Sequence, residues 1–295
     1  MTFDDNAKIG GGKVSKRGRN VGIGVGGGIG VIAIVLIGQL LGVDLSGLVG
    51  AGGGGGAVDS SSDEVITNCE TGADANAGIE CRLEGAAESL DAYWAEEAPA
   101  LGATYATTNV KLFSEGVATG CGNATSAVGP FYCPPDQLIY LDTTFYDELR
   151  SRFGASGGPL SEMYVIAHEW GHHIQNLTGA ISASQDGTTG AASGSVRVEL
   201  QADCYAGAWV AAASTQPTAA SDVPLLKPVT PAEIADALNA AASIGDDRIQ
   251  QQSGGDVNPE AWTHGSSEQR QKWFQAGYDG GAAACDTFSV SDSKL

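Results

Sequence analysis

Basic side chains are scarce in this chain of 295 residues: 15 lysines and arginines stand against 35 aspartates and glutamates. The formal net charge of -20 excludes nucleic acid as a partner, because phosphate recognition requires a basic surface. Charged residues make up only 17% of the chain and hydrophobic residues 42%, which excludes wholesale disorder. The 43 glycines follow no G-X-Y period, which excludes collagen. The sequence therefore predicts a chain that folds around a hydrophobic core.

Ionisable residues are absent from Val21 to Val43, a stretch long enough to span a bilayer as a helix. Basic residues precede it and acidic residues follow it, so the positive-inside rule places the N-terminus in the cytoplasm. This pattern predicts a basic cytoplasmic tail over residues 1–20 and a transmembrane anchor over residues 21–43. The protein would then be a single-pass protein of the cell membrane with its remainder extracytoplasmic. A cleaved signal peptide is the alternative, since it also joins a basic start to an apolar run.

The rest of the chain divides into a linker and one domain. Residues 44–63 contain runs of glycine and serine, which bury no large side chain and predict a flexible linker. The folded domain is expected over residues 64–295, and all six cysteines lie in it. An even number of cysteines beyond a membrane segment predicts disulfides, and the absence of C-x-x-C argues against a cysteine zinc knuckle. The simplest pairing is Cys69 with Cys81, Cys121 with Cys133, and Cys204 with Cys285.

Hydrophobic periodicity predicts an α+β domain that is mostly helical and has a small sheet. Apolar residues at intervals of three and four indicate helices, capping boxes mark helix starts, and short β-rich runs indicate strands. Helices are predicted over residues 79–97, 161–177 and 196–213 and from Thr230 and Ser266, and strands over residues 109–113 and 137–141. The strand at residues 137–141 is either an edge strand that binds an extended peptide or a buried strand of the core.

The helix predicted over residues 161–177 carries His168-Glu169-Trp170-Gly171-His172, an H-E-x-x-H motif. Residues four apart share a helix face, so both imidazoles can bind one Zn2+ ion while Glu169 stands beside it as a general base. Only four histidines occur in the whole chain, and two of them are in this motif. The motif therefore predicts a catalytic zinc site with His168 and His172 as metal ligands. Surface histidines without a metal are the alternative.

A catalytic zinc needs a third protein ligand and a position open to water. Gln175 and Thr178 stand where the extended metzincin motif requires glycine and histidine, so that interpretation fails. On the next predicted helix, Glu199 and Asp203 lie four apart and share a face. We expect Glu199 to be the third ligand and Asp203 to support a zinc histidine through its outer ring nitrogen. The alternatives are Asp203 as the ligand itself and a solvated acidic helix face.

His264 lies away from the motif, in a short polar segment just before a predicted helix. Peptide hydrolysis needs a donor for the developing oxyanion, and we expect His264 to be this catalytic donor. A disulfide between Cys204 and Cys285 would tie the Glu199 helix to the segment that follows His264. A surface or helix-capping histidine is the alternative. His173 is expected to support the ligands or to pack, rather than to bind metal.

The motifs that matter in combination are His168-Glu169-Trp170-Gly171-His172-His173, Glu199-x-x-Ala-Asp203-Cys204-Tyr205-Ala-Gly207, Gly129-Pro130-Phe131-Tyr132-Cys133-Pro134 and Thr263-His264-Gly265-Ser266. Together they resemble the bacterial putative neutral zinc metallopeptidase family, over roughly Ala106 to Cys285. The resemblance implies a zincin-like fold, a Zn2+ site similar to that of gluzincins, and peptide or protein substrates. The expectation is thus a membrane-anchored zinc endopeptidase that uses a metal-activated water and Glu169 as base. A noncatalytic envelope binding module with a structural zinc is the alternative.

Overall fold

Helices outweigh strands in the computed structural model, which describes residues 2–17, 63–184 and 187–295. The helices are α3 (Gly72–Ala77), α4 (Ile79–Glu97), α5 (Phe145–Ser151), α6 (Pro159–Thr178), α7 (Ala180–Ser184), α8 (Gly194–Ala212), α9 (Pro231–Ser243), α10 (Asp246–Gln252) and α11 (Ser267–Gly280). The strands are β1 (Val14–Lys16), β2 (Glu64–Val65), β3 (Asn109–Leu112), β4 (Gly116–Thr119), β5 (Gly122–Thr125), β6 (Phe131–Cys133) and β7 (Leu138–Leu141). The predicted α+β class with a small sheet is confirmed.

Five strands form one sheet in the order β2-β1-β3-β7-β6, and β4 and β5 form a separate hairpin. β1, β3 and β7 are parallel, whereas β2 and β6 run antiparallel to their neighbours at the two edges. β7 pairs on both sides, with β3 and β6. Of the two alternatives for the strand predicted at residues 137–141, the structure therefore selects the buried core strand, and the edge strand on this side is β6.

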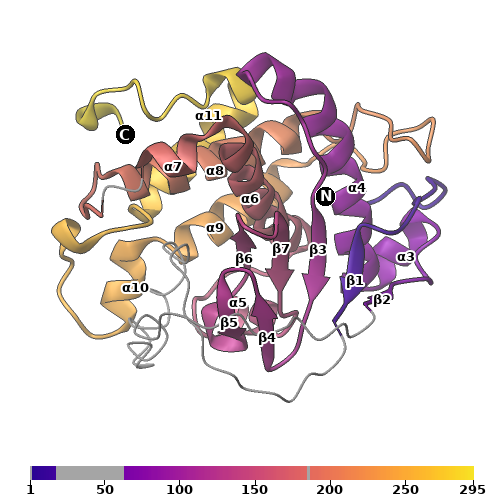
Figure 1. Cartoon of the computed structure of the whole chain (residues 1–295), viewed down its shortest axis with the longest axis horizontal. Helices are drawn as coiled ribbons and strands as arrows, with labels where there is room; N and C mark the ends of the chain where they lie inside the picture. Colours follow the sequence, from indigo (N-terminus) through magenta and orange to yellow (C-terminus); the bar gives the residue numbers. More distant parts are fainter. Residues whose placement is uncertain (1, 18–62, 185–186) are drawn as a thin grey trace.

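The two faces of this sheet contribute to different hydrophobic clusters, because successive residues of a strand point to opposite sides. Ile139 and Leu141 of β7 enter the main core, which the helices cover. Tyr140, between them, enters a smaller cluster with Phe131 and the hairpin residue Val117. Figure 1 shows α4 and α6 lying along the sheet on the main-core side, with α8 and α11 beyond them. The catalytic helix predicted from the sequence is thus enclosed between the sheet and further helices.

Close approach between helices is possible because two glycines lie where they cross. A Cβ atom on Gly171 of α6 would lie 3.0 Å from the Ala202 Cα of α8, and one on Gly277 of α11 would lie 1.8 Å from the Cys204 carbonyl oxygen. Any larger residue at Gly277 would push α11 away from α8. These contacts bring the H-E-x-x-H helix, the Glu199 helix and the last long helix together in one layered unit.

Local signals in the sequence match the helix boundaries. α4 covers residues 79–97 as predicted. Capping boxes form at Thr230 with Glu233 and at Ser266 with Gln269, each at the start of a helix. The three disulfides also have the predicted pairing, and the Cys204–Cys285 bond joins α8 to the chain after α11.

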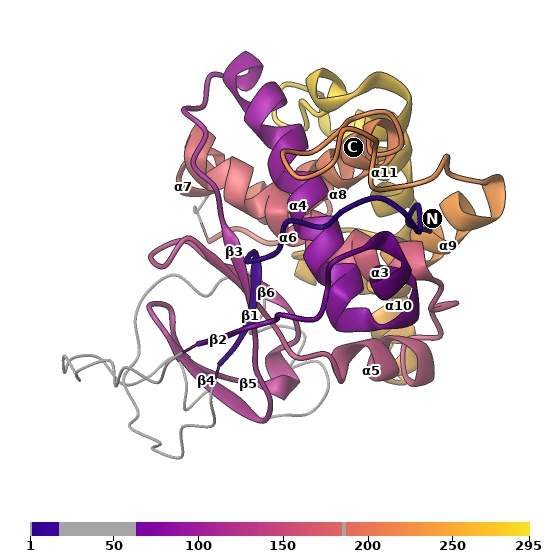
Figure 2. The same cartoon turned by 90° about the vertical axis from the view of Figure 1, so that its right-hand side faces the viewer.

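Residues 2–17, which make up most of the tail predicted over residues 1–20, pack against the domain. β1 is a strand of the main sheet, and Phe3 is fully buried beside Gly85 of α4. The fully buried carboxylate of Glu84 accepts hydrogen bonds from the backbone amides of Lys13 and Val14, each at 2.7 Å. Figure 2 shows the N-terminal segment running across α4 and α3.

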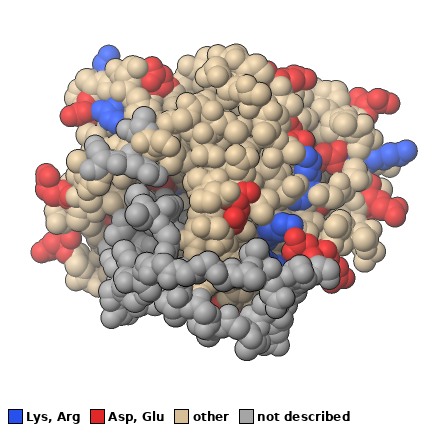
Figure 3. Space-filling view, viewed as in Figure 1, with Lys and Arg blue, Asp and Glu red and all other residues tan. Residues whose placement is uncertain are grey.

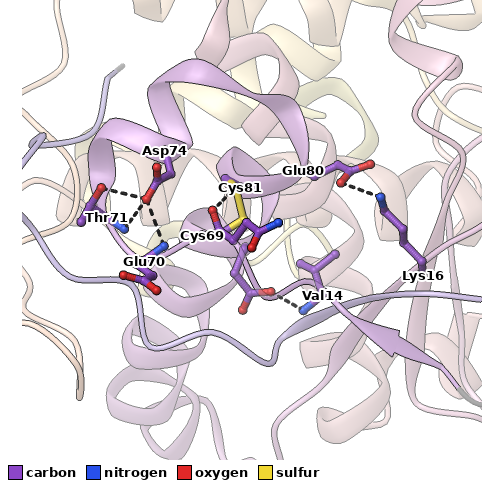
Figure 4. The surroundings of a disulfide bond; sticks show 10 residues. Val14, Lys16, Cys69, Glu70, Thr71, Asp74, Glu80 and Cys81 are labelled. Atoms are coloured by element: carbon purple, nitrogen blue, oxygen red, sulfur yellow. Dashed lines mark hydrogen bonds and ion pairs between the residues drawn. A yellow bond between two sulfur atoms is a disulfide. The ribbon is translucent and has the colours of Figure 1, made fainter.

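The end of this segment is held next to a disulfide. Lys16 forms an ion pair with Glu80 at 2.8 Å, close to the Cys69–Cys81 bond (Figure 4). A chain that crossed a bilayer once between residues 17 and 63 could not form this ion pair, so the packing of residues 2–17 and the single crossing predicted at residues 21–43 exclude each other. Residues 2–17 are held mainly by hydrogen bonds from their backbone amides to carboxylates far away in the sequence. The distribution of charge along the sequence does not reveal such contacts.

The anchor predicted over residues 21–43 lies outside the described residues, as does nearly all of the linker predicted over residues 44–63. Among the helices in residues 2–17, 63–184 and 187–295, none combines the length and the apolar character that a membrane crossing requires.

Phe3→Ala should lower the free energy of unfolding of the full chain by about 3–5 kcal/mol, because it removes a fully buried aromatic ring. Urea unfolding measures the change. Lys8→Ala, at an exposed position of the same segment, is the control and should change stability by no more than about 0.5 kcal/mol. Equal effects of the two substitutions would contradict the packing of this segment in the core.

Candidate metal centre

Three buried side chains converge at one point between two helices: His168 and His172 of α6 and Glu199 of α8. Each contributes a ligand atom that lies within 4.8 Å of the other two. The Glu199 Oε2 atom is 3.2 Å from His168 Nε2, and its Oε1 atom is 3.6 Å from His172 Nε2. The structure therefore brings together the three residues that the sequence predicts as ligands.

Local geometry and close packing both produce this arrangement. His168 and His172 are four residues apart on α6, so their rings lie on one face of the helix. Gly171 between them has no side chain, and α8 approaches α6 there. The contact is with Ala202 of α8. Glu199 lies almost one helical turn before Ala202, and its carboxylate reaches both rings. A larger residue at position 171 would separate the two halves of the site.

The donor set fits a zinc ion. Two imidazole nitrogens and one carboxylate are a common ligand set of catalytic zinc. The Nδ1 atom of each histidine has its own hydrogen-bond partner, and the Nε2 atoms of both histidines face Glu199. In addition, the Glu169 Oε2 atom is buried and has no hydrogen-bond partner within the described residues. A buried polar atom without a partner is costly unless a bound group or water satisfies it.

Asp203 supports His168 from the side away from Glu199. Its Oδ1 atom lies 2.8 Å from His168 Nδ1, and Tyr164 donates its hydroxyl hydrogen to the same carboxylate. Arg270 of α11, which is almost completely buried, donates from Nε to Asp203 Oδ2 at 2.8 Å. Asp203 therefore lies at Nδ1 of His168, whereas Glu199 lies at the Nε2 atoms of His168 and His172. Neither Arg270 nor Tyr164 belongs to a recognisable sequence motif, so their part in the site becomes visible only in the structure.

Electrostatics at the site favour ionised carboxylates. Burial alone would lower the pKa of His168, but the charge and hydrogen bond of Asp203 raise this pKa to about 9. Burial opposes the ionisation of Asp203, yet Arg270 and His168 lower its pKa. The pKa of Glu199 is also lowered in spite of burial, chiefly by the charge of His172 and the hydrogen bond of His168. Figure 3 shows other charged side chains scattered over the surface of one face, whereas this group is enclosed.

Glu169 differs from the other two carboxylates. Burial raises its pKa, and the charges of His172 and His168 offset this only in part. The backbone amide of Tyr132, on the edge strand β6, donates a hydrogen bond to the Glu169 carboxylate. A raised pKa makes a carboxylate a stronger base, which is what a general base needs.

His264 is buried beside the site and does not lie on the surface. Its Nδ1 atom is 3.1 Å from Asp246 Oδ1, and Asp246 Oδ2 accepts backbone hydrogen bonds from Thr263, His264 and Gly265 at 2.7, 2.7 and 3.1 Å. Burial would lower the pKa of His264, but the hydrogen bond to Asp246 and the charge of Glu199 raise it. Asp246 was not predicted from the sequence, since it precedes His264 by a whole helix.

His173 lies apart from the three converging side chains. It is fully buried, with Nε2 2.6 Å from the Ala106 carbonyl oxygen and Nδ1 3.0 Å from the Tyr132 hydroxyl oxygen. Both ring nitrogens therefore have partners, and the residue joins α6 to β6 and to the chain before β3. This placement agrees with the expectation that His173 packs rather than binds metal.

Comparison with known proteins gives one family and several relatives. The model of the family described as "Putative neutral zinc metallopeptidase" matches residues 2–288, including the N-terminal segment that packs on α4. The uncharacterized protein Rv2575 of Mycobacterium tuberculosis is 49% identical over 255 residues, which cover 86% of each chain. The uncharacterized protein YpfJ of Escherichia coli is 37% identical over 271 residues, which cover 90% of this chain and 88% of the relative. No solved structure matches the chain.

Proposed function

The chain belongs to the putative neutral zinc metallopeptidase family, and from this premise we propose that it is an endopeptidase that hydrolyses peptide bonds at the His168, His172 and Glu199 site. The observation that carries the proposal is the buried Glu169 oxygen without a partner next to this His-His-Glu group. A structural zinc site would need no such carboxylate. A general base for peptide hydrolysis would.

His168, His172 and Glu199 would hold Zn2+ through two imidazole nitrogens and a carboxylate oxygen. Zinc in such a site lowers the pKa of water and polarises a carbonyl group. Glu169 takes the proton of the attacking water and later passes it to the leaving amine. The raised pKa of Glu169 suits both steps, because the proton must be held and then released. Asp203, backed by Arg270, keeps the His168 ring oriented.

His264 is the proposed donor to the developing oxyanion. Its ring is held by Asp246, and the hydrogen bond to Asp246 together with the charge of Glu199 raises its pKa. The edge strand β6, whose Tyr132 amide already contacts Glu169, is the proposed site where an extended peptide adds as a further strand. The first assignment puts a substrate contact near Glu199, whose charge acts on His264, and the second puts one beside Glu169.

The proposal is tested by incubating the full chain with a denatured protein mixture, with and without a zinc chelator. Cleavage should stop with chelator and return when zinc is added back. Glu268→Gln, an exposed change on α11, should behave as the parent. A folded, zinc-loaded protein that cleaves nothing would instead favour the noncatalytic binding module.

His264→Ala should lower kcat by about 10²- to 10³-fold, because one donor to the oxyanion is lost. Zinc content and the free energy of unfolding are measured alongside, and zinc content should not change because His264 is not one of the three ligands. A kcat within a few-fold of the parent, in a folded protein that keeps its zinc, would show that the oxyanion donor lies elsewhere.

We further propose that the domain works outside the cytoplasm. The three disulfides support this location, since such bonds persist in oxidising compartments. Single-pass attachment through residues 21–43 is a prediction from the sequence, and the packing of residues 2–17 against the domain argues against it. A carbonate wash of membranes tests attachment, and mapping of cysteines without reduction tests location. Free thiols in the protein from its native compartment would contradict the proposed location.

A further inference from the structure

The ring of His172 is supported by the side-chain amide of Gln175, whereas the ring of His168 is supported by the carboxylate of Asp203. We infer that Gln175 and Gln201 position His172 for zinc through a chain of hydrogen bonds that ends at the backbone of Cys285. Both are positioning residues, since they act through His172. The inference rests on the proposed zinc site and is independent of peptidase activity.

Gln175 lies almost one turn after His172 on α6 and is fully buried. Its Oε1 atom is 2.8 Å from His172 Nδ1. Its Nε2 atom donates to the Val198 carbonyl oxygen at 2.7 Å and to Gln201 Oε1 at 3.1 Å. A glutamine amide has two hydrogens, and both have acceptors here, so the carbonyl oxygen has to face the imidazole.

This orientation selects the form of the imidazole. A neutral ring that donates from Nδ1 carries its hydrogen there and keeps a lone pair on Nε2. The Nε2 atom of His172 is the one that faces Glu199, on the side of the proposed metal. Gln175 therefore holds His172 in the tautomer and the ring orientation that can bind zinc.

Gln201 fixes the orientation of Gln175 in turn. The Gln201 Nε2 atom donates to the Cys285 carbonyl oxygen at 2.8 Å, which leaves Oε1 to accept from Gln175. Cys285 is bonded to Cys204 on α8, only three residues after Gln201. The outer end of the chain is thus attached covalently to the same helix that provides Glu199.

A neutral amide is suited to this position for an electrostatic reason. Three buried carboxylates already surround the site, from Glu169, Glu199 and Asp203, and within the described residues only Asp203 has a buried arginine as partner. A fourth carboxylate at position 175 would add repulsion between like charges in a region of low dielectric constant. Gln175 supplies the acceptor that His172 needs without adding charge.

The test is the zinc affinity of full-length variants, measured by competition with a chromophoric chelator. Gln175→Leu removes the acceptor and should raise the dissociation constant for zinc by about 10- to 100-fold. Gln175→Glu keeps an acceptor and should recover most of the zinc affinity, because a bound Zn2+ ion offsets the added negative charge. The repulsion between carboxylates should instead lower the stability of the metal-free variant. Gln216→Leu is the matched control, because Gln216 also donates to a backbone carbonyl, that of Ala92, but far along the chain from the site.

Two results would overturn the inference. One is a Gln175→Leu protein that is folded and binds zinc as tightly as the Gln216→Leu protein. The other is an equal loss in Gln175→Leu and Gln175→Glu, since the acceptor would then not matter. A parent protein that binds no zinc would reject the proposed site as well, whereas normal zinc binding without peptidase activity would reject only the enzyme.

A measurement on the parent protein covers the case in which Gln175→Leu does not fold. Long-range ¹H–¹⁵N spectra of the metal-free full chain distinguish the two tautomers of a neutral histidine such as His172. His172 should carry its hydrogen on Nδ1. A hydrogen on Nε2 would overturn the inference without any substitution.

Discussion

Glu169→Gln should lower kcat by about 10²- to 10⁴-fold while zinc stays bound, because the substitution removes the proposed general base and none of the proposed ligands. Glutamine has nearly the same shape as glutamate, so the packing of α6 against α8 is preserved. The variant also loses a buried carboxylate with a raised pKa, and its stability should therefore not fall below that of the parent. Turnover of an unfolded protein substrate, zinc content and urea unfolding are the three measurements.

The control for this variant is Glu268→Gln, which makes the same change at an exposed position of α11. Its kcat, zinc content and stability should equal those of the parent. Glu169→Gln protein with undiminished turnover would assign the base to another residue. Loss of zinc together with turnover would instead make Glu169 part of the ligand set.

Glu199→Ala should abolish zinc binding and activity together. Loss of even an outer partner of a zinc ligand costs about 10- to 100-fold in affinity, so removing a ligand should cost more than about 100-fold. The protein should also lose stability when zinc is present, because metal affinity contributes to the free energy of folding. Zinc content after dialysis and urea unfolding with and without zinc measure both effects.

Glu96→Ala, an exposed change on α4, is the control for Glu199→Ala and should retain zinc. The comparison with Glu169→Gln separates the two roles: one variant should lose metal and turnover, the other turnover alone. A Glu199→Ala protein that keeps its zinc would contradict the proposed ligand set. Asp203, four residues further along the same helix, would then be the residue to test as ligand.

The parts of the fold that the sequence reveals depend on neighbours within a few residues. The stripe from Leu83 to Trp94 predicts α4 because helix geometry repeats every three to four residues. The capping boxes at Thr230 and Ser266 are formed by residues three apart. The H-E-x-x-H spacing works in the same way, since His168 and His172 share a face as soon as the helix forms. Strand partners are not local, which is why β7 could be an edge or a core strand until the sheet order was known.

The sequence by itself determined the helix that carries His168 and His172 and the acidic pair on the next helix, and it indicated one cysteine pairing only as the simplest of those possible. Only the tertiary structure decided which groups complete the site: Arg270 behind Asp203, Asp246 behind His264, and Gln175 with Gln201 behind His172. It also decided that residues 2–17 belong to the domain, through the buried carboxylate of Glu84 and the pocket for Phe3. The physical reason is the same throughout. A motif is set by backbone geometry over a few residues, whereas a buried polar group takes its partner from whichever distant element packs against it.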